Sequence, residues 1–258
     1  MMRLRLAGFA FFILFTLLAA AILWPAATLV PWLERASNGH WQLSAAQGTL
    51  WNGRGTLLSR AGDAAPWRYA QSIQWRARWR DLLGGRLGVD IIFEQGGHAL
   101  LAVTPGRVAL ERFDLSLPAP AIVVLLPGAL GRYGWAGRLR ARGDNFRCAW
   151  NSHSCNGEME LLWSDAAVAE APGSKLGDYR FRLVGEGQAL RVDLTTLNGR
   201  LQINGSGEIT DGGLSFRGEA GATGSDAASL DALLRTLGRP AATPGKYQID
   251  YRDTNVPR

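Results

Sequence analysis

The sequence predicts a mainly β fold, in which a single N-terminal transmembrane helix precedes an antiparallel, curved β-sheet domain with one or two short helices. Three observations lead to this prediction. An apolar run near the N-terminus is long enough to cross a bilayer, short segments of alternating apolar and polar residues recur behind it, and glycine-rich separators divide them. Strands that recur about every ten residues are typical of a meandering sheet, not of alternating strands and helices.

The transmembrane prediction rests on the run Leu6–Trp24, which is almost wholly apolar and follows Arg3 and Arg5. A bilayer core requires about 20 apolar helical residues, so this stretch can span it. The two arginines favour the cytoplasmic side of the membrane. We therefore expect residues 1–5 in the cytoplasm, residues 6–24 in the bacterial inner membrane and residues 25–258 in the periplasm.

A cleaved signal peptide is the alternative interpretation of this run. Residues 19–21 are three alanines, which could supply the small side chains that a signal peptidase reads. However, the apolar run exceeds the usual h-region of roughly 7–15 residues and continues past these alanines, which favours an uncleaved anchor. Trp24 and Trp32 would then lie at the periplasmic interface, where amphipathic aromatic side chains concentrate.

The clearest predicted strand is Ser72–Arg80, because apolar and polar residues alternate along its whole length. Its apolar positions, which would share one face of the sheet, are Ile73, Trp75, Ala77 and Trp79. The next strand places Leu87, Val89, Ile91 and Phe93 on one side. Weaker alternation predicts strands at 107–117, 137–142, 158–163, 179–183, 189–194, 200–203, 214–217 and 247–251. Asn-Gly at 198–199 and at 204–205, with Asp-Gly at 211–212, predicts tight turns.

Two helices are predicted behind the apolar run. In Ser225–Leu237, leucines recur at i, i+3, i+4 and i+7, and Gly238 ends the pattern, which indicates an amphipathic helix packed on its own sheet. The run Ala119–Leu126 is apolar on all sides, and periodicity leaves open whether it is a buried helical turn or a strand. Both segments precede a strand that starts with glycine, which suggests two related halves meeting near residues 130–170.

The two cysteines, Cys148 and Cys155, are flanked by two predicted strands and lie near their connecting loop. In the periplasm, oxidising conditions favour a disulfide between them. His153 lies between the two cysteines, so a metal site is the alternative. Two thiols and one imidazole are fewer than the four ligands of a closed zinc site, which favours the disulfide.

The sequence offers little for catalysis, so we expect no enzyme activity, no catalytic residues, no metal and no cofactor. The three histidines stand far apart, and no nucleophile elbow, P-loop or dinucleotide fingerprint occurs. The net charge of +6 is modest for 258 residues and forms no nucleic-acid-binding motif, which argues against a nucleic-acid partner. Alternating arginines at 76–80 and at 138–142 are interpreted as a solvated outer face, with anionic lipid or an acidic partner as the alternative.

Two stretches carry a resemblance to a known family. The first runs from Ser44 to Leu57 with the core Gly-Thr-Leu-Trp-x-Gly, and the second runs from Trp75 to Leu87 with the core Leu-Leu-x-Gly-x-Leu. This order resembles the bacterial type II secretion system protein N family (general secretion pathway protein N), as does the C-terminal sequence at 245–249. The motif residues are Gly48, Leu50, Trp51, Gly53, Trp75, Leu83, Gly85 and Leu87. The likeness covers most of the chain, including the N-terminal anchor.

The resemblance implies a non-enzymatic inner-membrane component of the apparatus that exports folded proteins from the periplasm across the outer membrane. Its expected partners are other type II secretion components and the inner membrane. A looser resemblance to AsmA-like proteins implies the alternative function, a periplasmic lipid-binding or lipid-transfer protein whose apolar sheet face receives lipid. An apolar sheet face must be covered by something, so strand alternation is compatible with both functions.

Overall fold

A computed structural model describes residues 2–60, 65–123, 134–149, 154–168, 175–210, 213–223, 230–231, 233–235 and 238–253, with side chains from 11 to 252. The helical elements are α1 (Met2–Ile22), the 3-10 turn η1 (Ala26–Thr28), α2 (Leu29–Ala36), α3 (Trp79–Leu82) and α4 (Ala119–Val123). Residues 230–231 and 233–235 are also helical. In the part of the chain with described side chains, no helix is both long enough and apolar enough to cross a membrane.

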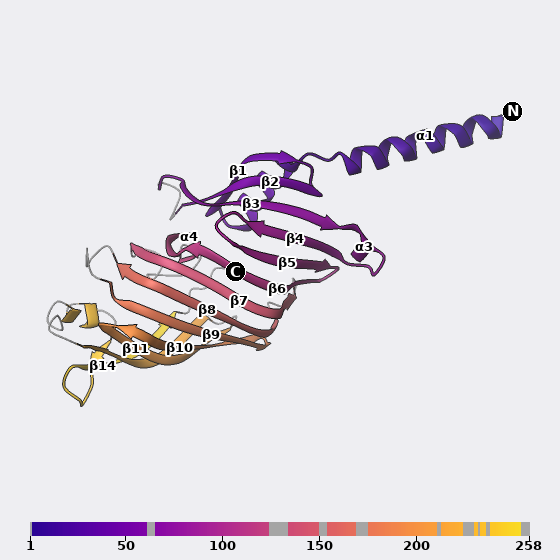
Figure 1. Cartoon of the computed structure of the whole chain (residues 1–258). Helices are drawn as coiled ribbons and strands as arrows, with labels where there is room; N and C mark the ends of the chain where they lie inside the picture. The colour runs from indigo at the N-terminus through magenta and orange to yellow at the C-terminus, as the bar shows by residue number, and fades with distance from the viewer. Residues whose placement is uncertain are drawn as a thin grey trace.

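Fourteen strands of the described residues form one antiparallel sheet, in which the spatial order follows the chain except that β14 lies between β12 and β13. The first strands are β1 (Trp41–Gly48), β2 (Asn52–Ser59), β3 (Arg68–Arg78), β4 (Leu87–Phe93), β5 (Gly97–Thr104), β6 (Arg107–Pro118) and β7 (Trp135–Ala149). The others are β8 (Cys155–Val168), β9 (Gly177–Gly187), β10 (Ala189–Gly199), β11 (Leu201–Thr210), β12 (Gly213–Ala222), β13 (Arg239–Pro240) and β14 (Lys246–Asp253). The sheet twists and curves from β1 to β14 (Figure 1). The predicted mainly β, antiparallel and curved fold is confirmed.

One face of the sheet is mainly apolar, because the register keeps apolar side chains or glycines opposite one another from strand to strand. The buried Gln71 of β3, opposite Leu57, is an exception on this face. One row crosses the molecule through Gly53, Trp75, Ile91, Ala99, Phe113, Gly143, Met159, Leu183, Val192, Gly207, Phe216 and Tyr251. Since strand side chains alternate between faces, the neighbouring row on the other face is polar. The alternation read from the sequence is therefore preserved across hydrogen-bonded neighbours as well as along each strand.

The opposite face carries charges of alternating sign in a matching row. Its charged members are Asp114, Arg142, Glu160, Arg182, Asp193, Arg217 and Asp250, with His98 at one end and the uncharged Ser206 between Asp193 and Arg217. The Arg142 guanidinium lies 2.9 Å from the Glu160 carboxylate, and Arg182 pairs at 2.6 Å with Glu158. Opposite charges directly across a strand pair contribute roughly 0.2–1 kcal/mol each. Arg138, Arg140 and Arg142 are exposed on this face, as the interpretation as a solvated outer face predicts, and Arg76 is exposed as well. Arg80, the last arginine of the first row, lies in α3 and not on the sheet face.

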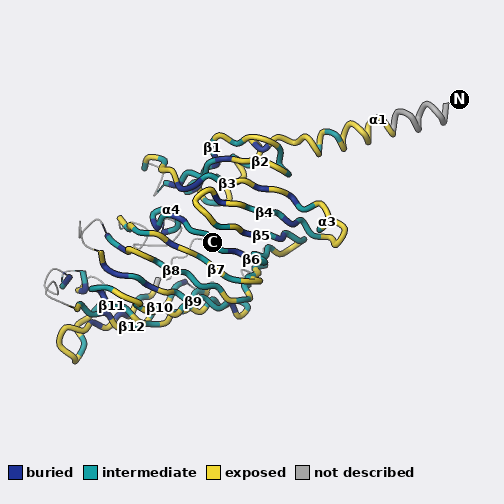
Figure 2. Tube along the Cα trace, in the orientation of Figure 1, coloured by how far each residue is buried: buried dark blue, intermediate teal, exposed yellow. Residues whose placement is uncertain are grey.

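Short helices of the same chain cover parts of the apolar face. α2 and η1 lie over the first strands, where Leu33 and Val30 pack against buried Trp41 and Leu43. α4 packs its buried Val123 against Leu139 of β7. Figure 2 shows the resulting pattern, in which buried and half-buried positions alternate with exposed ones along the strands. The core is thus a chain of small clusters along one sheet face.

Of the helix predicted at Ser225–Leu237, the structure describes residues 230–231 and 233–235, which are helical and pack on the sheet of the same chain, as expected. Leu230 and Leu234 are buried against Tyr247 and Ile249 of β14, with Leu233 packed at the edge of the same cluster. The first residues predicted for this helix, 225–229, lie outside the described residues. Residues 119–123, which the sequence left open between helix and strand, form the helical turn α4, and residues 124–126 also lie outside the described residues.

The strand prediction at Ser72–Arg80 ran too far at its C-terminal end. β3 ends at Arg78, and Trp79 begins α3, so Trp79 does not share the apolar face with Trp75. The amide groups of Gly84 and Arg86 donate hydrogen bonds to the carbonyl of Asp81. These bonds turn the chain into a helical loop before β4. α2 and α3 were not predicted at all.

One predicted tight turn is also wrong. Asn204-Gly205 lies within β11, not in a loop. A side chain at Gly205 would lie 2.4 Å from the carbonyl oxygen of Arg217 and 2.7 Å from the Phe216 ring. Gly205 therefore leaves the space that the backbone of β12 and the Phe216 ring occupy. Asn198 and Gly199 are the last two residues of β10 and pair with Asp178 and Gly177 of β9, so the chain turns into β11 one residue later than predicted, at Arg200. Residues 211–212 lie outside the described residues.

The sheet is continuous through the region where two related halves were predicted to meet. β6, β7, β8 and β9 pair in succession along most of their lengths. Residues 124–133 and 169–174, which lie inside that region, are outside the described residues. The relationship between the two halves stays a prediction.

Substituting Leu230 by alanine should destabilise the fold, because its side chain is only 1% exposed. Leucine-to-alanine changes at buried sites cost about 2–5 kcal/mol. We expect a clear fall in the denaturation midpoint of the purified full chain. Leu197, which is 47% exposed on β10, supplies the matched control, and Leu197→Ala should leave the midpoint nearly unchanged. Equal midpoints for the two variants would show that the C-terminal helix is not part of the core.

The carboxyl of Asp114 should titrate below its ordinary range. Arg140 donates hydrogen bonds to it and lowers its pKa, and the charge of Arg142 lowers the pKa less. A lowered folded-state pKa means that this pair stabilises the fold above the unfolded pKa of about 3.9 and that the stabilisation is lost as the pH falls through the folded pKa. By NMR titration, Arg140→Gln should raise the pKa of Asp114 more than Arg142→Gln does. An unchanged pKa in Arg140→Gln would contradict the pairing.

Candidate functional site

The Gly-Thr-Leu-Trp-x-Gly motif forms the β1–β2 turn, and its two glycines pair across the hairpin. Gly48 has φ +89°, and a Cβ there would lie 2.5 Å from the carbonyl oxygen of Asn52. At Gly53, a Cβ would lie 2.5 Å from the Trp75 ring. Gly48 is thus needed for a left-handed conformation and a close backbone approach, whereas Gly53 makes room for a tryptophan.

The β1–β2 turn contacts the C-terminal end of α1. The Leu50 amide donates to the carbonyl of Trp24 at 2.8 Å, and the Trp51 indole N–H donates to the carbonyl of Ala21 at 2.7 Å. An isolated bridge also pairs Pro25 with Thr49. The last carbonyls of a helix have no partner further along the helix, and the Trp51 indole supplies a donor to one of them, that of Ala21. The Leu50 bond fixes the connection directly behind the helix. The motif therefore joins α1 to the sheet.

The same turn is also bound to β3. The buried Trp75 indole donates to the carbonyl of Leu50 at 3.1 Å, and the Ala77 amide donates to the carbonyl of Trp51 at 2.6 Å. The rings of Trp51 and Trp79 lie 4.8 Å apart between centroids. Through these contacts the turn connects the end of α1 with the first residue of α3. Tilted aromatic pairs at this spacing add roughly 0.5–1.5 kcal/mol beyond their area burial.

The α3 loop (Trp79–Gly85) is shaped by the carboxylate of Asp81. This side chain is largely enclosed, lying 3.4 Å from the Arg78 guanidinium and 3.5 Å from that of Arg86. A Cβ at position 88 would lie 2.1 Å from the carboxylate, so Gly88 leaves the space that it occupies. Gly85, at φ +72°, then returns the chain to β4. The loop therefore has one shape, in which the Asp81 carboxylate lies beneath the helical turn and pairs with arginines on both sides of it.

The eight motif residues fall into two adjoining groups. Gly48, Leu50, Trp51, Gly53 and Trp75 gather around the β1–β2 turn, where Gly48 pairs with Gly53 and Trp75 pairs with Gly53 and donates to the carbonyl of Leu50. The others belong to the α3 loop and the start of β4. There, Leu83 is 93% exposed, Gly85 closes the loop and Leu87 is half-buried in the sheet. The pair of Trp51 and Trp79 joins the two groups.

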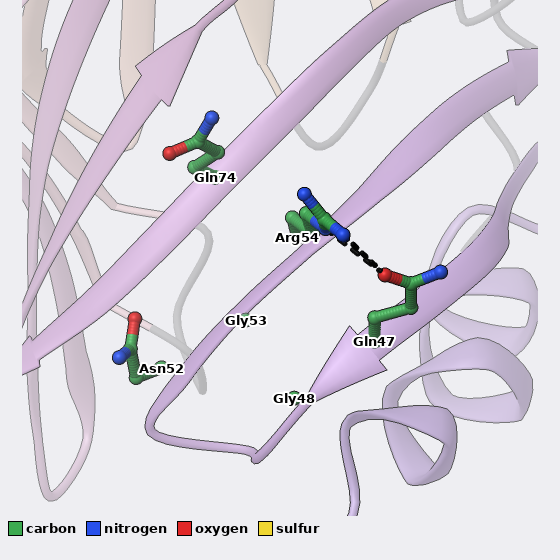
Figure 3. Close-up of a pocket in the computed structure, with 6 residues that line it drawn as sticks. All are labelled: Gln47, Gly48, Asn52, Gly53, Arg54 and Gln74. Carbon is green, nitrogen blue, oxygen red and sulfur yellow. Dashed lines mark hydrogen bonds between the residues drawn. The ribbon is translucent and has the colours of Figure 1, made fainter.

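On the polar face beside the turn, the sheet carries an open hollow of about 300 Å³ (Figure 3). It is lined by Gln47, Gly48, Asn52, Gly53, Arg54 and Gln74. The Arg54 guanidinium donates to the Gln47 amide oxygen at 3.0 and 2.7 Å. The lining offers amides and one cation, without a nucleophile paired to a base. Such a surface can form hydrogen bonds to a polar partner.

In the part of the chain that the structure describes, no three His, Cys, Asp or Glu residues gather closely enough to hold a metal ion. Tyr179 has a raised pKa because its phenol is buried, with a smaller effect from the charge of Asp178. Its hydroxyl donates to the carbonyl of Leu201 at 2.9 Å. This hydrogen bond joins β9 to β11 within the core.

Cys148 and Cys155 form a disulfide, as predicted, at the end of the β7–β8 hairpin. The two residues are direct partners across the strand pair. His153, the third residue of the alternative metal site, lies outside the described residues. The disulfide lies at the same end of the sheet as the α3 loop. Leu87, the first residue of β4 behind that loop, is connected to Cys148 by successive strand partners across β4 to β7, which are Leu87, Val103, Val108 and Cys148.

Fold and site together define a single-sheet β protein in which a compact tryptophan-glycine cluster joins an N-terminal apolar helix to the sheet. A family model for the type II secretion system (T2SS) protein N matches residues 39–250. The chain belongs to this family. The match begins behind α1 and so concerns the sheet domain. No curated protein and no solved structure matches the chain.

The structure also shows site residues that the sequence patterns did not reveal. Trp79 was assigned to a strand face but stacks on Trp51. No sequence pattern marks the carboxylate of Asp81 as a residue that shapes the loop. The sequence Asp-Leu-Leu-Gly-Gly at 81–85 predicts a turn directly behind Arg80, but it does not indicate that the strand ends two residues earlier, at Arg78. The contact between Trp51 and Ala21 has no sequence signal, since it joins elements 30 residues apart.

The disulfide predicts a simple labelling result. Under unfolding conditions, a thiol reagent should label the protein only after reduction, because both cysteines of the chain are in the bridge. Mass spectrometry would count the labels. Equal labelling with and without prior reduction would contradict the bridge.

Proposed function

We propose that this protein is an inner-membrane component of the type II secretion apparatus that presents a periplasmic sheet to other components of the machine. Family membership supports a role in type II secretion. The observation that carries the finer proposal is the bonding of the β1–β2 turn to the end of α1 by Leu50 and Trp51. Bonding of this kind transmits the position of a helix to the sheet behind it.

The anchor is proposed to be the apolar helix, with residues 1–5 in the cytoplasm and residues 25–258 in the periplasm. Large apolar side chains of α1 are exposed on several sides of the helix, including Phe11, Phe12, Leu14, Phe15, Leu17 and Leu18. A helix that is apolar all round is expected to be enclosed by lipid or protein, and no described residue of the sheet encloses these side chains. Arg3 and Arg5 in front of the run favour a cytoplasmic N-terminus.

We further propose that the protein acts by contact and not by catalysis. The site joins backbone carbonyls to indole and amide donors, and its carboxylate, Asp81, is engaged by two arginines. None of these groups is arranged as a nucleophile with its base. The polar face with its paired charges and the open hollow beside Arg54 provide surfaces for protein partners.

One observation favours the alternative function of lipid binding. Leu183 and Val192, direct partners at the middle of the apolar face, are only half-buried. They lie between the cluster around Phe113 and the cluster beneath Leu230, and they belong to neither. An apolar sheet surface of this kind could receive an acyl chain as well as another protein.

The proposed function predicts a secretion defect that depends on the anchor. In a strain that lacks the gene, folded exoproteins should accumulate in the periplasm, and the full chain should restore their release. A chain in which residues 1–24 are replaced by a cleavable signal peptide should reach the periplasm but fail to restore release. Exoproteins would be measured in medium and periplasm by immunoblotting. Full secretion in the deletion strain, together with altered outer-membrane lipid, would instead support the lipid-handling alternative.

A further inference from the structure

The α3 loop displays apolar side chains on its outside. Within this loop, defined here as Trp79–Gly85, Leu83 is 93% exposed, Trp79 is 50% exposed and Leu82 is also exposed. Two neighbouring leucines and a tryptophan at one loop are unusual for a surface that meets only water, because each forgoes the free energy of burial. Single exposed apolar residues need no explanation, but a group at one tip indicates a contact.

The loop is held in this shape by its own bonds. The amides of Gly84 and Gly85 donate to the carbonyls of Asp81 and Leu82 at 3.0 Å each. The Asp81 carboxylate lies beneath the turn, between Arg78 and Arg86. The hydrogen bonds of the turn therefore hold Leu82 and Leu83 pointing outward. Such a turn can display its leucines without rearranging when it meets a surface.

The loop lies at the end of the sheet from which α1 departs, as Figure 1 shows. A short series of contacts ties the two together. Trp79 stacks on Trp51, and the Trp51 indole donates to the carbonyl of Ala21 near the end of α1. Trp24, directly behind α1, is exposed as well. If α1 crosses a bilayer, the bilayer surface passes close to this end of the sheet.

The chemistry of the loop matches a bilayer surface. Tryptophan is enriched at membrane interfaces, where its ring lies among the head groups. Arg80 is exposed on the same loop and pairs with no described acid, whereas Arg86 is occupied by Asp81 and Glu111. A free guanidinium beside exposed leucines suits an anionic lipid surface, to which a basic residue adds about 1 kcal/mol.

We propose that the α3 loop inserts into the periplasmic leaflet of the membrane that α1 enters, with Leu82 and Leu83 among the acyl chains and Arg80 at the phosphates. This inference rests on the proposed anchor. It adds a second membrane contact, which orients the sheet. Because the β1–β2 turn bonds α1 to the sheet, helix and sheet move together, and one membrane contact still lets this unit tilt against the bilayer, whereas two separated contacts limit the tilt.

The test places an environment-sensitive fluorophore on the loop. The full chain carrying Leu83→Cys is labelled with a nitrobenzoxadiazole probe and reconstituted into vesicles of phosphatidylethanolamine and phosphatidylglycerol. The natural cysteines are bridged, so the added thiol reacts alone. The probe should show blue-shifted emission that lipids with nitroxide-bearing acyl chains quench. The same probe at Leu197→Cys, near the opposite end of the strands, should show aqueous emission without quenching.

Charge dependence is tested with the same samples. Quenching should weaken in vesicles of phosphatidylcholine alone, and Arg80→Gln should reduce the difference between the two lipid compositions. In cells, Leu83→Glu should lower exoprotein release while the protein stays in the membrane fraction. Leu197→Glu is the matched control and should secrete normally.

The outcomes separate the two proposals. If carbonate washing leaves the protein in the vesicles but the probe at position 83 stays aqueous, the loop contact is wrong and the anchor stands. Shielding of the probe only after another secretion component is added would also overturn the lipid contact, in favour of a protein partner. If carbonate removes the protein, the anchor fails and the inference fails with it.

Discussion

The structure depends on keeping one face of a long sheet apolar from its first strand to its last. Side chains alternate with a period of two, so a slip of one residue in any strand pair would move every later apolar residue to the polar face. The row from Gly53 to Tyr251 avoids this across all the intervening pairs. Where two backbones or a ring approach too closely for a side chain, as at Gly143 beneath Phe113, glycine keeps the row unbroken. On the other face, the alternating charges oppose such a slip.

The motif residues around the β1–β2 turn begin this row. They therefore start the apolar face and also hold the end of α1. Gly53 lies beneath Trp75, which starts the apolar face, and the Trp75 indole binds the carbonyl of Leu50 in the turn. The same turn binds the end of α1, because the Trp51 indole donates to the carbonyl of Ala21. Packing that defines the first strands thus also sets where the helix leaves the sheet. This is why motif residues that look like ordinary β-sheet residues carry the proposed function of the chain.

The apolar face is covered unevenly, and this bears on both functions considered. α2 and α4 cover the first half, and the leucines at 230 and 234 cover the end. Between them, Leu183 and Val192 remain half-buried. A sheet of this width has more apolar area than its short helices can shield, so a partner or a lipid would gain free energy by completing the cover. Holding such a sheet at a membrane limits which surfaces it can meet.

The sequence alone determined the mainly β class, the antiparallel order, the disulfide and the packing of the C-terminal leucine stripe, because each follows from local periodicity or from cysteine chemistry. It also located the two motif stretches that the family match includes. Only the tertiary structure decided that Trp79 leaves the strand to stack on Trp51, that Gly205 lies within a strand, and that the β1–β2 turn binds the end of α1. These outcomes depend on contacts between residues distant in sequence, where space and hydrogen-bond partners override the local pattern. An alternating pattern indicates which side chains share a face. It does not indicate where contacts with another part of the chain cause the strand to end.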